Sequence, residues 1–205
     1  MLSEMMPKVE VGVPGVELNV GDHVCAFYPS MSERDEILIP YLAEGLHAGD
    51  KCIAVLDSGD GPSIARQVRD SPDDPTARRG DLAMYDSRET YLADGRFATD
   101  AMLEFWEESV TEALGGGFSF TRIAGEMTWA LSELPGVEDL VEYEAELNRF
   151  LPRFPQVVVC LYELDRFDGE VLVDVLKTHP KVLLGGIVLA NPYYLEPDEF
   201  LASRW

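Results

Sequence analysis

Two short segments of the sequence are apolar at every position, and they constrain the fold more than any other feature. These segments are Cys52–Leu56 and Val157–Leu161. A strand that is apolar throughout is covered on both faces, which is typical of the central strands of a parallel sheet. The runs that we expect to form strands are His23–Tyr28, Cys52–Leu56, Leu82–Tyr85, Phe118–Ile123, Val157–Tyr162 and Val182–Ala190. Because amphipathic stretches separate these runs, the sequence predicts an α/β fold with a mostly parallel central sheet flanked by helices.

The stretches between the runs have the spacing of amphipathic helices. The helices are expected over about 31–48, 99–114, 137–152 and 169–177. The first has the clearest ends, because Ser30 and Glu33 have capping-box spacing and Gly49 is placed to end the helix. The pair Gly185–Gly186 divides the final apolar run, which indicates a hairpin or a bulge.

The length and composition fit one domain. With 205 residues, 46% of them hydrophobic, the chain can bury a core of its own. Residues 1–20 carry two prolines and no sustained periodicity, so we expect a mobile N-terminal arm or a short edge strand there. A single domain is expected over 21–205, with its longest linker at about 70–80.

The chain is strongly acidic, with 16 Lys and Arg against 38 Asp and Glu and a formal net charge of −22. Such a surface repels phosphate backbones and anionic lipid headgroups, so a nucleic-acid or membrane partner is disfavoured. The three cysteines Cys25, Cys52 and Cys160 lie inside apolar stretches, and no signal peptide or membrane-spanning run is apparent. We therefore expect a cytoplasmic protein.

Several common catalytic motifs are missing from the sequence. There is no GxxxxGK[ST] loop to cradle a nucleotide triphosphate and no GxGxxG dinucleotide fingerprint. GxSxG and HExxH are also absent. We expect no ATP or GTP as cofactor, the cofactor stays unknown, and no residue is assigned as catalytic.

The candidate ligand site lies at the ends of the predicted strands, where open α/β sheets bind their ligands. Arg122 stands inside an apolar run and needs an anionic partner, which Glu126 or a ligand carboxylate can supply. The alternative is a purely structural ion pair. Trp129 likewise has two interpretations, packing in a lid or contact with the ligand. The expected ligand-binding residues are Tyr28, Asp57, Tyr85, Arg122, Glu126 and Trp129.

His23 and Cys25 stand two positions apart on a predicted strand, so both side chains emerge on the same face. Ligation of a metal or a haem by this pair is one interpretation. The other makes His23 a strand-end residue and Cys25 a small buried hydrophobe, because no third or fourth ligand is nearby in the sequence. His179, just before Pro180, is expected to have a structural role.

Several longer motifs occur in a fixed order: HVCAFY, RIAGEMTWAL, EYEAELN, VVVCLYELDRF, LKTHPKVLLGG and NPYYLEP. From about residue 21 to 201 the chain resembles the MEDS family, the methanogen/methylotroph DcmR-type sensory domain. The resemblance implies a RecA/KaiC-like three-layer sandwich with degraded nucleotide motifs, which senses small molecules such as hydrocarbon derivatives. The residues that match the family pattern are His23, Cys25, Phe27, Tyr28, Arg122, Gly125, Glu126, Trp129, Tyr143, Glu144, Asn148, His179, Asn191, Pro192 and Tyr193. No binding or catalytic set is transferred by this match.

Three functions stay open at this point. The first is a non-enzymatic sensor that binds a small molecule and regulates a kinase, an anti-sigma factor or a transcription regulator in trans. The second is a hydrolase or transferase in which Glu126 is the general base and Asp57 or Glu163 holds a cation or polarises the substrate. The third is a degenerate RecA-like scaffold that assembles a homo-oligomer.

Overall fold

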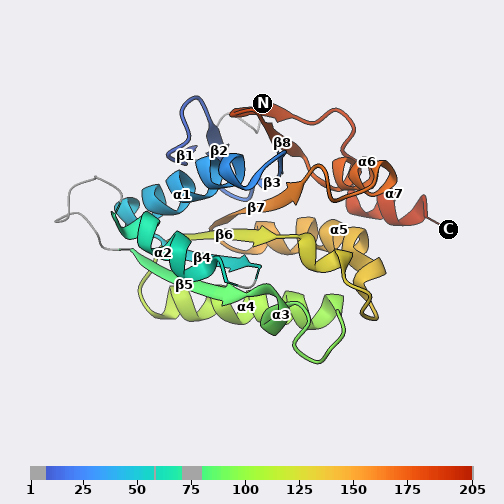
Figure 1. Cartoon of the computed structure of the whole chain (residues 1–205), viewed down its shortest axis with the longest axis horizontal. Coiled ribbons are helices and arrows are strands. Elements are labelled where there is room, and N and C mark those ends of the chain that lie inside the picture. Colours follow the sequence, from blue (N-terminus) through green and yellow to red (C-terminus); the bar gives the residue numbers. More distant parts are fainter. Residues whose placement is uncertain (1–7, 58, 71–79, 205) are drawn as a thin grey trace.

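A seven-stranded sheet forms the centre of the protein (Figure 1). The computed structural model describes residues 8–57, 59–70 and 80–204. The strand order is β5-β4-β6-β7-β3-β8-β9, and every neighbouring pair is parallel except β8 and β9. The strands are β3 (His23–Tyr28), β4 (Lys51–Leu56), β5 (Asp81–Asp86), β6 (Thr121–Glu126), β7 (Gln156–Glu163), β8 (Lys181–Leu184) and β9 (Ile187–Ala190). The predicted mostly parallel sheet is confirmed, and the glycine pair connects β8 and β9 as a hairpin.

Helices cover both faces of the sheet. The α-helices are α1 (Met31–Ala48), α2 (Gly61–Asp70), α3 (Ser87–Thr90), α4 (Thr99–Gly115), α5 (Leu140–Phe150), α6 (Gly169–Thr178) and α7 (Pro197–Ala202). Short 3-10 helices are η1 (Thr128–Leu131), η2 (Val137–Asp139) and η3 (Leu151–Arg153). One core contains residues of α1 and α2, and the other contains residues of α4 to α7. The predicted three-layer sandwich is therefore confirmed.

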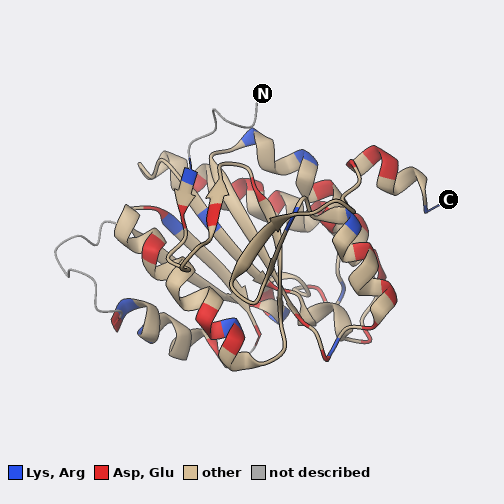
Figure 2. Cartoon of the chain, turned by 90° about the horizontal axis from the view of Figure 1, so that it is seen from above, with Lys and Arg blue, Asp and Glu red and all other residues tan. Residues whose placement is uncertain are grey.

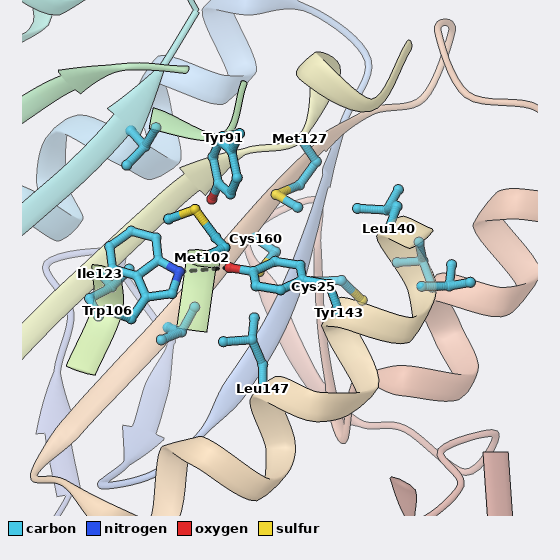
Figure 3. Packing of buried hydrophobic residues seen from close by; sticks show 14 of the residues in the cluster. Cys25, Tyr91, Met102, Trp106, Ile123, Met127, Leu140, Tyr143, Leu147 and Cys160 are labelled. Atoms are coloured by element: carbon cyan, nitrogen blue, oxygen red, sulfur yellow. Dashed lines mark hydrogen bonds between the residues drawn. The ribbon is translucent and has the colours of Figure 1, made fainter. Parts of the chain in front are cut away.

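Strand β3 shows how the strands divide the two cores. Val24, Ala26 and Tyr28 face the core beneath α1, whereas Cys25 and Phe27 face the core beneath α4 and α5. Because both faces are covered, all six residues of the strand are buried. Side chains of α4 and α5 fill the second core together with residues of the sheet (Figure 3).

Helix α1 begins and ends where the sequence predicts. The Ser30 side chain accepts a hydrogen bond from the backbone N–H of Glu33 at 3.4 Å, and Gly49 ends the helix in the left-handed conformation. Gly45 brings the helix close to the sheet, because a Cβ built there would lie 2.5 Å from the sulfur of Cys52. The helix is thereby held directly over β4.

Of the two alternatives for residues 1–20, a mobile arm or a short strand, the structure has strands from Lys8 onward. Strands β1 (Lys8–Glu10) and β2 (Glu17–Asn19) form an antiparallel pair. Its valines and leucine are buried in the α1 core, and the backbone carbonyl of Glu10 accepts a hydrogen bond from Arg122 at 2.6 Å. The burial of these few apolar side chains holds the segment in place, although they are too few to show a period. Residues 1–7 lie outside the described residues.

Two further elements differ from the prediction. Helix α2 was not predicted, because its apolar positions are few and it opens with a Gly-Pro pair. Strand β6 was expected over Phe118–Ile123 but spans Thr121–Glu126. The strand can include the charged residues Arg122 and Glu126 because each has a partner of opposite charge inside the fold. Most of the expected linker, residues 71–79, lies outside the described residues.

Charge is distributed over the outer layers of the molecule. Figure 2 shows acidic residues on most of the helices, with Lys and Arg scattered among them. In the part of the chain that the structure describes, no helix is long and apolar enough to cross a bilayer.

Candidate functional site

A buried network surrounds Glu126 at the carboxyl edge of the sheet. The Glu126 side chain is 1% exposed. Its Oε1 accepts hydrogen bonds from the Tyr28 hydroxyl at 3.0 Å and from Arg34 Nη1 at 3.1 Å. Its Oε2 accepts from the backbone N–H of Asp57 at 2.9 Å. Two predicted site residues, Tyr28 and Asp57, therefore meet the third, Glu126.

Arg34 is the residue of this network that sequence reasoning missed. Its Nη1 also contacts Asp60 Oδ2 at 2.8 Å, and its side chain is 3% exposed. Burial works against the charged guanidinium, but the hydrogen bond to Asp60 and the charge of Glu126 raise the pKa of Arg34 above its ordinary value. Burial, and then the charge of the same carboxylate, raise the pKa of the Tyr28 phenol above its ordinary value. The sequence shows only an arginine in the first turn of the predicted helix. Nothing in that pattern distinguishes it from a solvated arginine, because its burial becomes apparent only in the structure.

The network occupies the place of a phosphate-binding loop. Only Pro29 and Ser30 separate β3 from α1, so no glycine-rich loop follows the first strand of the large sheet. A P-loop would place backbone N–H groups and a lysine there. Here the start of α1 instead directs Arg34 at Glu126, whose negative charge already neutralises it.

Asp57 links three elements beside the network. Its Oδ1 accepts a hydrogen bond from the Ser87 hydroxyl at 2.8 Å, and its Oδ2 accepts from the Thr128 hydroxyl at 2.5 Å. These bonds join the end of β4 to the starts of α3 and η1. A carboxylate with both oxygens occupied in this way orders the loops at the sheet edge.

Two hollows flank the end of β5, and Tyr85 lines both. The larger, which we call the β5 hollow, measures about 520 Å³. Its walls come from β5, α3, α4 and the segment between the two helices, and are lined by Met84, Tyr85, Asp86, Glu89, Thr90, Tyr91, Ala93, Asp94, Arg96, Ala98, Ala101, Met102 and Phe105. The smaller hollow, about 360 Å³, is bordered by Asp57 and α2. The predicted site residues Asp57 and Tyr85 therefore lie at open space, unlike Tyr28 and Glu126.

Arg122 does not join this site. It lies on the same face of β6 as Glu126 but at the opposite end of the strand. Its Nε donates to Asp50 Oδ2 at 2.7 Å, and its guanidinium lies 5.8 Å from the centre of the Tyr41 ring. The prediction of a ligand-contacting Arg122 is therefore wrong, because the carboxylate at the start of β4 neutralises it within the core.

Trp129 belongs to the core and not to an open pocket. Its ring stacks on Tyr91, with centroids 4.7 Å apart, and on Phe97, with centroids 4.3 Å apart. It is 3% exposed, so direct ligand contact by Trp129 is not supported. Tyr91 also lines the β5 hollow, which makes Trp129 a neighbour of its wall.

His23 and Cys25 lie on one face of β3, as predicted, but they have different partners. Cys25 Sγ donates to the backbone carbonyl of Lys181 at 3.6 Å. His23 Nε2 lies 3.2 Å from Glu144 Oε2 and 3.4 Å from Cys160 Sγ. Within the described residues, the donor atoms gathered around His23 come from Glu144, Cys160 and His179, and Cys25 is not among them. Glu144 and Cys160 come from segments far from His23 in the sequence. The sequence offered a signal for Glu144 alone, because it is an acidic residue among the apolar positions of a predicted helix.

A three-layer parallel α/β domain with this strand order, in which no glycine-rich loop follows the first strand of the large sheet, has a RecA-like fold. Solved structures with this fold include a KaiC-like protein of Pyrococcus horikoshii, with a TM-score of 0.58 and 13% identity over 86% of this chain and 79% of that chain. An ATPase from a bacterial type III secretion system gives a TM-score of 0.56 and 12% identity over 97% of this chain and 67% of that one. These likenesses concern the fold alone.

Sequence comparison gives the family. Residues 22–180 match the family described as MEDS, the methanogen/methylotroph DcmR sensory domain. The transcriptional repressor DcmR of Methylorubrum extorquens is 31% identical over 169 residues, which are 82% of this chain. The chain spans 61% of the length of that relative. The protein belongs to the MEDS family of sensory domains.

Proposed function

We propose that this domain senses a small organic molecule in the β5 hollow and passes the signal to a regulatory protein in trans. The observation that carries the proposal is a hollow of ligand size at the carboxyl edge of a sheet whose phosphate-binding loop is missing. Small-molecule sites combine apolar walls with a few polar groups, in cavities of about 300–1,000 Å³. The β5 hollow meets both conditions.

The lining of the hollow favours a molecule with an apolar body and one polar group. Tyr85 and Phe105 meet edge to face, with centroids 5.4 Å apart, and Met102 adds a thioether. Three carboxylates, those of Asp86, Glu89 and Asp94, and the guanidinium of Arg96 supply the charged groups of the hollow. A small hydrocarbon derivative with a hydroxyl, amine or halogen substituent fits such a lining.

The signal has a short route out of the hollow. Tyr91 lies in its wall and stacks on Trp129, which belongs to the segment after β6. The Phe97 N–H donates to the Pro135 carbonyl at 2.9 Å, so the same segment is tied to the hollow at a second point. We propose that residues 128–136, which carry the partly exposed Leu131 and Leu134, rearrange on binding and change the surface offered to the partner.

The partner class follows from the relative. DcmR is a transcriptional repressor by name, and we extend a role in transcription to this chain on that ground. A kinase or an anti-sigma factor in trans is the other proposed partner. Whether the chain forms a homo-oligomer is measured by light scattering of the protein in solution.

A hydrolase based on Glu126 has less support. Its Oε1 accepts from Tyr28 and Arg34, and its Oε2 accepts from the Asp57 N–H and, at 3.4 Å, from Arg34 Nη1, so the acceptor positions of the carboxylate are occupied and none is free to take a substrate proton. Micromolar affinity for a divalent metal, lost in Glu126→Gln, would restore this alternative.

The proposal is tested first by native mass spectrometry of the protein purified from its own host. A retained small molecule is the expected result. Its binding is then measured in Ala101→Trp, which fills the hollow from an exposed position of α4, and in Thr111→Trp, an exposed control on the same helix. We expect loss of binding in the first variant only, with slower hydrogen exchange of residues 128–136 on binding. Equal binding by both variants would contradict the assignment of the hollow.

If no molecule is retained, a panel of small aliphatic alcohols, amines and halides is screened by ligand-observed NMR. Binding of any member that Ala101→Trp abolishes supports the proposal. If no compound of the panel binds and the hydrogen exchange of residues 128–136 is unchanged, the result counts against the sensor proposal and favours the oligomerisation scaffold.

A further inference from the structure

Four buried side chains from separate elements point their donor atoms at one place. They are His23 of β3, Glu144 of α5, Cys160 of β7 and His179, which follows α6, and we call them the His23 cluster. Their donor atoms all lie within 4.8 Å of one another. None of the four is used by the β5 hollow or by the Glu126 network.

The spacing of these atoms matches a small tetrahedron. His23 Nε2, Cys160 Sγ and His179 Nε2 lie 3.2, 3.6 and 3.5 Å from Glu144 Oε2, and His23 Nε2 lies 3.4 Å from Cys160 Sγ. Tetrahedral Zn²⁺ with ordinary Zn–N, Zn–O and Zn–S bond lengths separates its ligand atoms by about 3.3–3.6 Å. Four of the six separations between the donor atoms are therefore close to those around a zinc ion, and the other two are within 4.8 Å.

Both histidines are oriented as metal ligands are. His179 Nδ1 lies 2.8 Å from the carbonyl of Val175, which can only accept, so Nδ1 carries the proton and Nε2 has the lone pair. His23 Nδ1 faces Asn148 Oδ1 at 3.1 Å, and the Asn148 amide is fixed because its Nδ2 donates to the Thr178 carbonyl at 2.7 Å. Carbonyl acceptors of this kind set the tautomer of metal-ligating histidines.

One polar atom of the cluster has no partner of its own. His179 is fully buried, and its Nε2 makes no hydrogen bond to the described residues. A buried lone pair without a donor costs free energy unless something binds it.

We propose that the His23 cluster is a closed metal site that binds one Zn²⁺ through two imidazole nitrogens, one thiolate and one carboxylate. Nitrogen and sulfur ligands select zinc over magnesium or calcium, which prefer oxygen. One thiolate and one carboxylate balance the charge of the ion, so the buried site has no net charge. Tyr162 donates its hydroxyl to the other carboxylate oxygen and holds Glu144 in place.

With four protein ligands the site leaves no open position, which is typical of structural zinc. Its ligands join two strands of the sheet to α5 and to the end of α6. The ion would therefore fix the helices on that face relative to the sheet.

The test uses the 205-residue chain with Cys25→Ser and Cys52→Ser, so that Cys160 is the single thiol. Both replaced thiols face backbone carbonyls, to which a serine hydroxyl is also able to donate. After chelation and dialysis the protein is titrated with Co²⁺ and then with Zn²⁺, in the presence of a reductant. We expect one ion per chain, visible bands of tetrahedral cobalt, a thiolate-to-cobalt charge-transfer band, and displacement of cobalt by zinc.

Two single variants locate the site. Cys160→Ser should lose the charge-transfer band and weaken zinc binding about 100-fold or more. Asn148→Ala removes the acceptor of His23 Nδ1 and the donor to the Glu144 and Thr178 carbonyls, and should weaken zinc binding about 10–100-fold. Circular dichroism reports whether each variant is folded. A folded double-serine chain that binds neither ion overturns the proposal, as does zinc affinity unchanged in Cys160→Ser. If Cys160→Ser does not fold, the charge-transfer band of the double-serine chain decides alone.

Discussion

Replacing Arg34 with methionine tests the buried network at the sheet edge. Methionine keeps much of the apolar stem of Arg34 and removes its charge. Glu126, 1% exposed, then retains the Tyr28 hydroxyl and the Asp57 N–H as donors but faces no positive charge. The folded state must carry an uncompensated carboxylate in its interior.

The magnitude follows from this geometry. Removing one partner of a buried ion pair costs about 3–5 kcal/mol. The two remaining donors place the loss at the lower end, at about 3 kcal/mol of unfolding free energy. For a chain of this size each kcal/mol shifts Tm by about 2–4 °C, so Tm should fall by about 6–12 °C.

Urea and thermal unfolding, followed by far-ultraviolet circular dichroism, measure the effect. Arg149→Met is the control, because Arg149 is 43% exposed and its ion pairs to Glu146 and Asp198 are worth at most about 1 kcal/mol. The double variant with Arg34→Met and Glu126→Gln should recover part of the loss, since glutamine removes the unpaired charge. The reasoning is refuted if Arg34→Met costs no more than Arg149→Met, or if the double variant is less stable than Arg34→Met alone.

Two further predictions concern packing. Gly45→Ala should lower the free energy of unfolding by about 1–3 kcal/mol, because its Cβ would lie 2.5 Å from the sulfur of Cys52. Gly115→Ala, at an open position of α4, should leave stability unchanged or raise it by up to about 1 kcal/mol, and equal urea midpoints for the two would contradict the close approach of α1. Trp129→Ala should cost about 3–5 kcal/mol in calorimetry because it empties an aromatic stack, whereas a variant of full stability would show that the stack contributes little.

The strands were predictable because burial on both faces leaves a mark in the sequence. The runs at β3, β4 and β7 consist mostly of apolar residues, so they can be identified without knowing which elements pack against them. The sequence was less informative for β6, where Arg122 and Glu126 look out of place until their partners Asp50 and Arg34 are known. Such partners lie on other elements, so no local pattern contains them.

The candidate site was predictable in part for the same reason. The rule that ligands bind at the carboxyl edge of a parallel sheet brought together Tyr28, Asp57 and Glu126. It could not show that Glu126 is closed off by an arginine, or that the open space lies beside β5. His23 was singled out, but its partners Glu144 and His179 come from segments that only the tertiary structure brings near.

The position of β3 in the sheet has a consequence for how the chain is made. β3 is the first strand of the large sheet in the sequence, yet Val24 pairs with Val159 on one side and with Lys181 on the other. During synthesis, both edges of this apolar strand stay unpaired until β7 and β8 have left the ribosome. Pairings so distant along the chain are slow to form and leave hydrophobic edges open to aggregation in the meantime. The central sheet of this domain can therefore be completed around β3 only after its last parallel strands, β7 and β8, have been made.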